Sequence, residues 1–334
     1  MISRVERTEY NNIDFMKVIM AVLVVAIHTS FSSIIGDVNG QKIIMRVLGI
    51  SVPFFFVASG FLIWNKIWSS SKEEKLNRLK GWIKKTARLY MWWTLIYLPF
   101  TIYGFYKDEN LSVLKSVALF FRNFLLVGEN YLSWPLWYLL GMLVAGCIIY
   151  LMVRWDWKDR TMFLVGLLFA LIGASINFCI SNGILESITA IYVKLFNSTR
   201  NGFFEGLPYI LIGVLIASKG VIKSKKILWV IFTVSFLLHM FGYSLADFVV
   251  VYSLFSLVIQ FDLKRRTDDL YKNFRLTSTV VYFVHMIWVG LITIFIPNII
   301  PPIFLFLLVV ILSFATATLV IKNKESQIVK LLFR

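Results

Sequence analysis

The sequence predicts an all-α polytopic membrane protein, with about ten transmembrane helices and with both termini in the cytoplasm. Hydrophobic residues make up 59% of the 334 residues, and the mean hydropathy is +0.78. Charged residues make up only 16%, against about 25% in ordinary soluble domains. The 34 lysines and arginines outnumber the 18 acidic residues, which gives a net charge of +16. This composition excludes a soluble enzyme, a disordered tail and a secreted disulfide scaffold.

Apolar segments long enough to cross a bilayer, about 20 residues each, follow one another along the chain. In order, the predicted spans are 13–32, 43–66, 88–106, 134–153, 161–180, 203–218, 227–242, 245–261, 278–297 and 302–321. Two shorter apolar segments, 111–127 and 184–196, contain charged residues and are predicted to be interfacial or re-entrant helices. No linker rich in glycine, serine or proline divides the chain. Residues 1–334 are therefore expected to form a single integral-membrane domain.

Basic residues are concentrated in alternate connections between the spans, and this pattern orients the chain. The lysine- and arginine-rich connections are 66–88, 154–160, 219–226, 262–275 and the segment after residue 321. Cytoplasmic loops of membrane proteins carry such an excess. The positive charge thus indicates topology and not binding to nucleic acid. Cys147 and Cys179 both lie inside apolar runs, so no disulfide and no metal site is predicted.

The first predicted span carries three ionisable residues, Asp14, Lys17 and His28. Charges at bilayer depth are costly and mark functional sites. Lys17 and His28 are separated by about 1100° of helical rotation, so they share a face within about 20°. Histidine exchanges protons near neutral pH, which makes His28 a candidate general base. The alternative is that Lys17 reaches the lipid headgroups and that His28 is a satisfied core histidine.

The other two histidines also fall within predicted spans. His285 lies near the middle of segment 278–297, where it either lines the same cavity as His28 or makes a local hydrogen bond. His239 lies towards the outer end of segment 227–242 and is the weaker candidate. Asp14 is about 21 Å of helix rise from His28, too far to orient it. Asp14 is instead predicted to pair with Lys17, one helical turn away.

Polar residues at the outer ends of two spans are candidates for binding or supporting an extracytoplasmic acceptor. Arg200 and Glu205 lie at the start of segment 203–218, and Trp137 lies at the start of segment 134–153. A helix cap with a surface ion pair is the competing explanation for Arg200 and Glu205. The belt of interfacial aromatic residues is the competing explanation for Trp137.

Basic residues before the third span are candidates for binding the phosphates of a nucleotide-bearing donor. They are Lys84, Lys85 and Arg88, to which Lys17 is added. The competing explanations are the positive-inside signal and the attraction of anionic lipids. In the second span, Ser59 and the glycine after it allow a close approach of helices or a local break.

Motifs that extend over nearly the whole chain share their order with one known family. They are the lysine and histidine of span one with ten residues between them (Lys17 and His28), VPFFFVASGF at 52–61, Arg88, SWPLWYLLGML at 133–143 and YFVH at 282–285. The chain resembles the integral-membrane acyltransferase family 3, whose ten-span members modify extracytoplasmic glycans. Lys17 stands where the family usually has arginine, so it supplies the charge but not the planar fork.

The resemblance implies a membrane O-acyltransferase. It implies transfer of an acyl group, acetyl by default, from cytoplasmic acyl-coenzyme A to a hydroxyl of a cell-surface glycan or glycan precursor. In this reading His28 is the base, and His285 or Ser59 are candidates to stabilise the oxyanion. No permanently bound cofactor and no metal are expected. The expected surroundings are the lipids of a bacterial plasma membrane.

Other functions remain open at this stage. The chain resembles the stand-alone branch of the family, because only a short tail follows the last span. The run TRNG at 199–202 is more weakly similar to the membrane domain of vancomycin-resistance serine racemases. The main alternative is a transporter of a small amino acid such as serine, or of a lipid-linked glycan. A partner subunit for glycan assembly is a third possibility.

Overall fold

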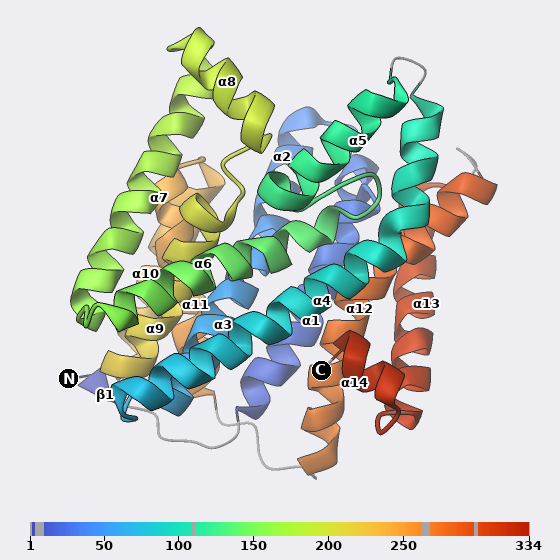
Figure 1. Cartoon of the computed structure of the whole chain (residues 1–334). Helices are drawn as coiled ribbons and strands as arrows, with labels where there is room; N and C mark the ends of the chain where they lie inside the picture. The colour runs from blue at the N-terminus through green and yellow to red at the C-terminus, as the bar shows by residue number, and fades with distance from the viewer. Residues whose placement is uncertain (1, 4–9, 109–110, 262–267, 297–299, 334) are drawn as a thin grey trace. The chain divides into compact units, whose positions relative to one another are not determined.

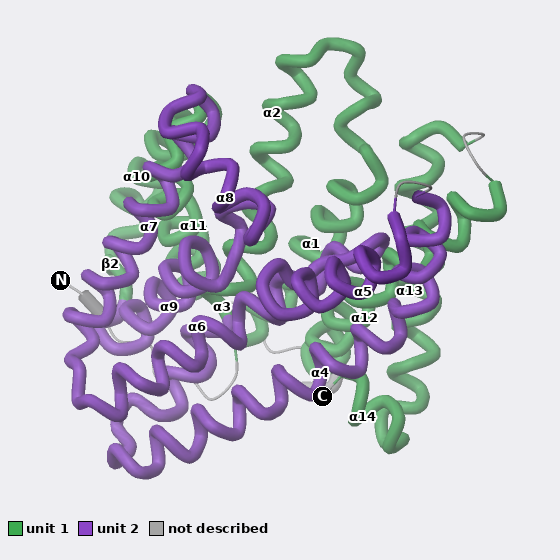
Figure 2. Tube along the Cα trace, turned by 45° about the horizontal axis from the view of Figure 1, so that its top comes forward, with its two compact units in different colours: residues 1–58, 221–334 green, residues 59–220 purple. Residues whose placement is uncertain are grey.

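Helices build almost the whole protein (Figure 1). The computed structural model describes residues 2–3, 10–108, 111–261, 268–296 and 300–333. Within these residues, strand structure is confined to β1 (Ile2–Ser3) and β2 (Val221–Ile222), which pair antiparallel. The all-α prediction is thus confirmed. The chain divides into two compact units, unit 1 (1–58 and 221–334) and unit 2 (59–220), coloured separately in Figure 2.

Unit 1 contains both ends of the chain. Its helices are α1 (Asn11–His28), η1 (Phe31–Ile34), α2 (Val38–Gly49), the first half of α3 (Ser51–Ile67), α10 (Lys225–Met240), α11 (Ser244–Gln260), α12 (Asp268–Phe295), α13 (Pro302–Lys322) and α14 (Gln327–Phe333). α1 and α13 both pack on α12, and α10 packs on α11. Apolar side chains fill the core, for example Ile13, Val280 and the rings of Phe54 and Phe255, which contact each other at a tilt of 59°; all four are fully buried. In a membrane such side chains stabilise the unit through close van der Waals packing against one another.

Helices α1 and α12 run parallel. Near their beginnings, Phe15 and Phe274 have ring centroids 6.0 Å apart. Further along both helices, the rings of His28 and His285 are 5.3 Å apart. Spans one and nine of a chain that crosses a membrane alternately must share a direction, so this pairing agrees with the predicted order of spans.

Unit 2 is a second helical assembly. It contains the remainder of α3, α4 (Lys72–Lys107), α5 (Val113–Arg122), η2 (Asn123–Val127), η3 (Trp134–Leu136), α6 (Trp137–Arg154), α7 (Asp159–Asn182), α8 (Glu186–Phe196), η4 (Gly202–Gly206) and α9 (Leu207–Lys219). α4 packs on α6, and α7 packs on α9. η2 and η4 are single π-helical turns, in which the hydrogen bonds span one residue more than in an α-helix.

Helix α4 begins at Lys72, well before the predicted span 88–106 that forms its apolar part. Ser71 caps its first turn, where the hydroxyl accepts a hydrogen bond from the backbone N–H of Glu74. Arg78 then pairs with Glu74 one turn away, at 2.8 Å. Residues 72–88 are therefore helical, and the expectation of a loop there is wrong. Hydropathy detects only the apolar part of a helix, whereas lysine, glutamate and arginine extend it in water.

Gly60 allows two helices of unit 2 to approach closely. A Cβ atom built on Gly60 would lie 2.1 Å from the carbonyl oxygen of Ile210 in α9. Any side chain at this position would collide with backbone, so α3 requires glycine here. The close approach predicted at this step of the second span is thus present, and α9 is its partner.

Seven helical stretches within the described part of the chain are long and apolar enough to cross a membrane. They are Asn11–His28, Val38–Ile67, Trp134–Arg154, Asp159–Asn182, Gly202–Lys219, Leu270–Phe295 and Pro302–Lys322. The other three predicted spans fall on α4, α10 and α11, of which α11 is a shorter apolar helix. The protein is a polytopic α-helical membrane protein, while the number of ten spans, the orientation and the single domain stay predictions.

The two short segments between the spans form short helices, as predicted. No residue of α5 or α8 is buried. The Arg122 guanidinium at the end of α5 donates to the carbonyl of Lys194 in α8, at 2.9 Å. Both helices lie at the upper end of unit 2 in Figure 1. Their place at the membrane interface stays a prediction.

Candidate functional site

Two histidines from separate helices stack in unit 1. His28 is the last residue of α1, and its ring lies 5.3 Å from that of His285, with an angle of 28° between the planes. His285 comes from α12 and is fully buried, whereas His28 is half-buried. The structure thus brings together two histidines that the sequence predicts to lie in spans one and nine.

The hydrogen bonds of His285 define its chemistry. Its Nδ1 lies 3.1 Å from the carbonyl oxygen of Val281, so Nδ1 carries the hydrogen and donates it. The neutral ring then has a lone pair on Nε2. Among the described residues, no group makes a hydrogen bond to this buried Nε2. An unsatisfied buried nitrogen is costly in a structural role, and such atoms are frequent in functional sites.

An ion pair joins the N-terminal halves of the same two helices. The guanidinium of Arg275 in α12 grips the buried carboxylate of Asp14, with its Nη2 2.6 Å from Oδ2 and its Nε 3.1 Å from both oxygens. The sequence reasoning paired Asp14 with Lys17 and assigned Arg275 to a loop, so it missed this partner. Because α12 begins at Asp268, Arg275 lies inside the helix. Lys17 is half-buried on α1.

The basic residues predicted to bind the donor lie on one helix of unit 2. Lys84, Lys85 and Arg88 are all exposed on α4. Positions 84, 85 and 88 fall within about one turn and so share one side of the helix. The structure therefore presents three cations on one helical surface, and their binding partner stays a prediction.

The aromatic and cationic candidates at the predicted outer side of unit 2 contact each other. The guanidinium of Arg200 lies 4.9 Å from the centre of the Trp137 ring, a cation–π distance. Trp137 is only 5% exposed, which leaves little of its ring to stack on a sugar. Supporting Arg200 is the role that this geometry allows. Glu205 is half-buried in η4, and the cap of this turn is Asn201, whose side chain accepts from two backbone N–H groups.

Two further polar groups in unit 2 lie near predicted site residues. The hydroxyls of Ser59 and Tyr138 are 2.9 Å apart and share a hydrogen bond. Glu129, which the sequence reasoning missed, accepts a hydrogen bond from the side-chain amide of Asn197 at 3.3 Å. Burial raises the pKa of Glu129, and the charge of Arg200 and this hydrogen bond offset part of the effect. A single acidic residue in a short connection gives no sequence signal of this kind.

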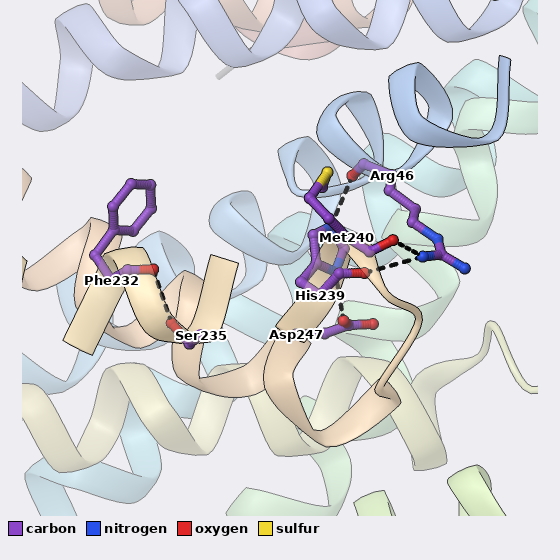
Figure 3. Close-up of polar contacts among 6 residues, drawn as sticks. All are labelled: Arg46, Phe232, Ser235, His239, Met240 and Asp247. Carbon is purple, nitrogen blue, oxygen red and sulfur yellow. Dashed lines mark hydrogen bonds and ion pairs between the residues drawn. The ribbon is translucent and has the colours of Figure 1, made fainter. Parts of the chain in front are cut away.

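His239 has a different environment, shown in Figure 3. Its Nδ1 lies 2.5 Å from a carboxylate oxygen of Asp247, and its Nε2 lies 3.0 Å from the backbone carbonyl of Arg46. The Arg46 guanidinium in turn donates to the carbonyl of Met240. Both ring nitrogens face acceptors, so both donate when the ring is protonated. This cluster ties α2 to the turn between α10 and α11, and both ring nitrogens of His239 have partners.

Comparison with known proteins gives the family. A family model described as an acyltransferase domain, Acyl_transf_3, matches residues 10–322. Two amino-acid racemases of Enterococcus faecalis are similar. One is 28% identical over 294 residues, which cover 79% of this chain and 39% of the relative. The other is 24% identical over 340 residues, which cover 94% of this chain and 46% of the relative. A serine/alanine racemase of Enterococcus gallinarum is 27% identical over 206 residues, which cover 61% and 28%. No solved structure matches the chain.

The family match covers every motif on which the predicted resemblance rests, from the first span to His285. The chain covers less than half the length of each of the three racemases. Racemisation is therefore the activity of proteins that are much longer than the matched region. The matched region itself is a membrane acyltransferase domain, and the chain belongs to acyltransferase family 3.

Proposed function

We propose that this protein is an O-acyltransferase of a bacterial plasma membrane. It moves an acyl group, acetyl by default, from cytoplasmic acyl-coenzyme A to a hydroxyl of an extracytoplasmic or cell-surface glycan. The observation that carries this proposal is the stacked pair of His28 and His285 in a chain of the acyltransferase family. The pair supplies proton acceptors within membrane-spanning helices, where such groups are kept for function.

The proposed reaction uses His28 as the base. His28 takes the proton of the acceptor hydroxyl while the hydroxyl oxygen attacks the thioester carbon. The tetrahedral intermediate then collapses, the carbon–sulfur bond breaks, and the departing coenzyme A sulfur takes the proton back from His28. The products are the ester and free coenzyme A, and the histidine is restored. Acid–base catalysis of this kind contributes about 10²–10⁴-fold to a rate.

His285 supports this base by position. Its ring stacks on His28, and its hydrogen bond to Val281 fixes its own orientation. Because the neutral ring has no hydrogen on Nε2, it is a poor donor to an oxyanion. Ser59, which is hydrogen-bonded to Tyr138 in unit 2, stays a candidate for that role from its place in the sequence alone.

The donor is proposed to bind through its phosphates. Lys84, Lys85 and Arg88 present three positive charges on one side of α4. Lys17 belongs to unit 1 and is a candidate phosphate ligand from its place in the sequence alone. Arginine binds phosphate oxygens through two parallel N–H groups, and lysine acts as a point charge. Asp14 is held by Arg275, so its role is to fix α1 against α12 rather than to contact substrate.

The alternative function, transport of serine or of a lipid-linked glycan, has no specific observation in its favour. The relatives are named for racemisation and not for transport. Purified protein in lipid nanodiscs, incubated with radiolabelled acetyl-coenzyme A, should release coenzyme A or transfer the label to a glycan. The same protein in liposomes should show no counterflow of radiolabelled serine. Counterflow without any turnover of acetyl-coenzyme A would contradict the proposal.

The role of His28 is tested in the same assay. His28→Ala should lose turnover while it keeps its expression level and its elution profile in detergent. Ile19→Ala is the matched control, because Ile19 is an exposed side chain of the same helix. Equal turnover by His28→Ala and Ile19→Ala would remove His28 from the mechanism.

A further inference from the structure

Two connections of unit 2 converge on a pair of opposite charges, of which the sequence singled out only Arg200. One connection follows the π turn η2 and contains Glu129. The other precedes the π turn η4 and contains Asn197 and Arg200. π turns are rare in proteins and are frequent at functional sites. Figure 1 shows the two connections within unit 2, one between α5 and α6 and the other between α8 and α9.

The first connection packs tightly against the beginning of α6. Gly128 ends η2 with a positive φ of 86°, and its N–H bonds to the carbonyl of Asn123. A Cβ atom built on Gly128 would lie 2.6 Å from the Cα atom of Trp137. Only glycine fits both the left-handed backbone and this contact. Glu129 is therefore held beside the residue that also supports Arg200.

Amide side chains fix both connections through bonds to each other and to the backbone. Asn123 donates to Asn130 at 3.0 Å, and Ser133 accepts from the backbone N–H of Asn130 at 2.7 Å. Asn201 donates to the hydroxyl of Tyr192 at 2.9 Å while it caps η4. These groups are satisfied by structure. They pre-organise the two connections, which lowers the cost of binding a ligand.

Glu129 and Arg200, by contrast, keep unused hydrogen-bonding capacity. Oε1 of Glu129 accepts from Asn197, while its other oxygen accepts from no described residue. The guanidinium of Arg200 rests on Trp137, and no carboxylate in the described part of the chain lies within 4.0 Å of it. The charge of Arg200 still lowers the pKa of Glu129 against the effect of burial. The two charges thus influence each other, and each is held by a third residue, Asn197 for Glu129 and Trp137 for Arg200.

We propose that Glu129 and Arg200 bind the acceptor by its hydroxyl groups, and that the ligand class is a carbohydrate. A hydroxyl donates one hydrogen bond and accepts others, so a sugar can donate to Glu129 and accept from Arg200 at once. Bonds to charged partners are the stronger ones. Asn197 and Trp137 are positioning residues for this pair. The proposal rests on the proposed acyltransferase function for its acceptor, and its binding step is separable from turnover.

The test measures acceptor dependence in nanodiscs with radiolabelled acetyl-coenzyme A and three probes: chitotriose, methyl glucoside and glycerol. Glu129→Gln and Arg200→Gln should each raise the KM for the sugar about tenfold or more, the effect of losing one charge-assisted hydrogen bond. Glu186→Gln, an exposed carboxylate of α8 in the same unit, is the matched control. Unchanged KM values in both variants would overturn the proposal.

Direct binding separates this proposal from the catalytic one. Stabilisation of the wild-type protein by chitotriose or methyl glucoside in a thermal-shift assay, lost in Glu129→Gln and kept in Glu186→Gln, supports the site even if no acyl transfer is found. Stabilisation by none of the three probes overturns it. Stabilisation by L-serine instead of the sugars also overturns it, because a zwitterion would then be the ligand of the two charges. Absence of acetyl-coenzyme A turnover in the wild type counts against the catalytic proposal alone.

Discussion

Unit 1 holds histidines in two opposite environments. His239 has an acceptor at each ring nitrogen, the carboxylate of Asp247 and the carbonyl of Arg46. His285 uses only Nδ1, and its buried Nε2 has no partner among the described residues, with the ring of His28 stacked on it. The number of ring nitrogens with a hydrogen-bond partner therefore distinguishes His239 from His285, although both lie in predicted spans.

The difference has a physical meaning. A histidine with two acceptors gains most as a doubly donating cation and holds helices together. A histidine with an unused lone pair keeps the capacity to take a proton or to accept a hydrogen bond from a ligand. Location in a membrane span alone would make all three histidines candidates. The hydrogen-bond partners of His239 remove it from the candidates, and His28 and His285 remain.

The largest effect is expected at His28. His28→Ala should lower acyl transfer about 10²–10⁴-fold, because it removes the proposed general base. The rate of transfer per folded molecule, normalised by the monodisperse peak in detergent, is the measurement. If the total transfer falls only because less protein is folded, so that the rate per folded molecule is kept, His28 has a structural role like that of His239.

His285 should act through the stack. His285→Ala should lower kcat about 10–10²-fold, because the base loses the ring that orients it and small displacements of reacting groups are costly. The KM for acetyl-coenzyme A should not change. His285→Phe keeps a ring of similar shape but lacks Nε2, so it should recover only the part of the rate that depends on the stacked ring. Failure of phenylalanine to rescue, with rescue by glutamine instead, would show that Nε2 and not the stack is required.

The hydrogen bonds of His239 should contribute to the stability of the protein and not to catalysis. His239→Leu removes both hydrogen bonds and should lower stability by about 1–3 kcal/mol. The melting temperature in detergent should fall, while transfer per folded molecule below that temperature is kept. A His239→Leu variant that melts like the wild type but has lost acyl transfer would show that His239 acts in the reaction and not in stability.

The smallest effect is expected at the ion pair between α1 and α12. Asp14→Asn weakens a pair in which the carboxylate is buried and the arginine side chain is 58% exposed, so the loss should be about 1–2 kcal/mol. Added salt should narrow the gap in melting temperature between wild type and Asp14→Asn. A gap that salt leaves unchanged would argue against an electrostatic tie at this end.

Local sequence patterns predicted the helices well and their partners less well. Apolar length revealed α7 and α13, and helical spacing together with the cost of intramembrane charge singled out His28. The start of α4 was missed because its first four turns are charged and capped by Ser71, features that a hydropathy measure does not see.

Contacts between distant residues were beyond local reasoning. The pair of Asp14 and Arg275 joins positions 261 residues apart, and only the packing of α1 on α12 reveals it. Glu129 was missed for a similar reason, since its neighbours Asn197 and Arg200 come from another connection. The satisfied state of His239 also depends on Arg46, which lies 193 residues away. A sequence thus suggests which residues are costly to bury, and the structure shows which of them are satisfied.

The most direct test of this account compares His28→Ala with His239→Leu in one acyl-transfer assay. Both variants are reconstituted in nanodiscs, held below their melting temperatures and supplied with radiolabelled acetyl-coenzyme A and a glycan acceptor. The account predicts that His28→Ala is folded and inactive and that His239→Leu is less stable but active. Transfer by His28→Ala at the rate of the wild-type protein would contradict the central claim.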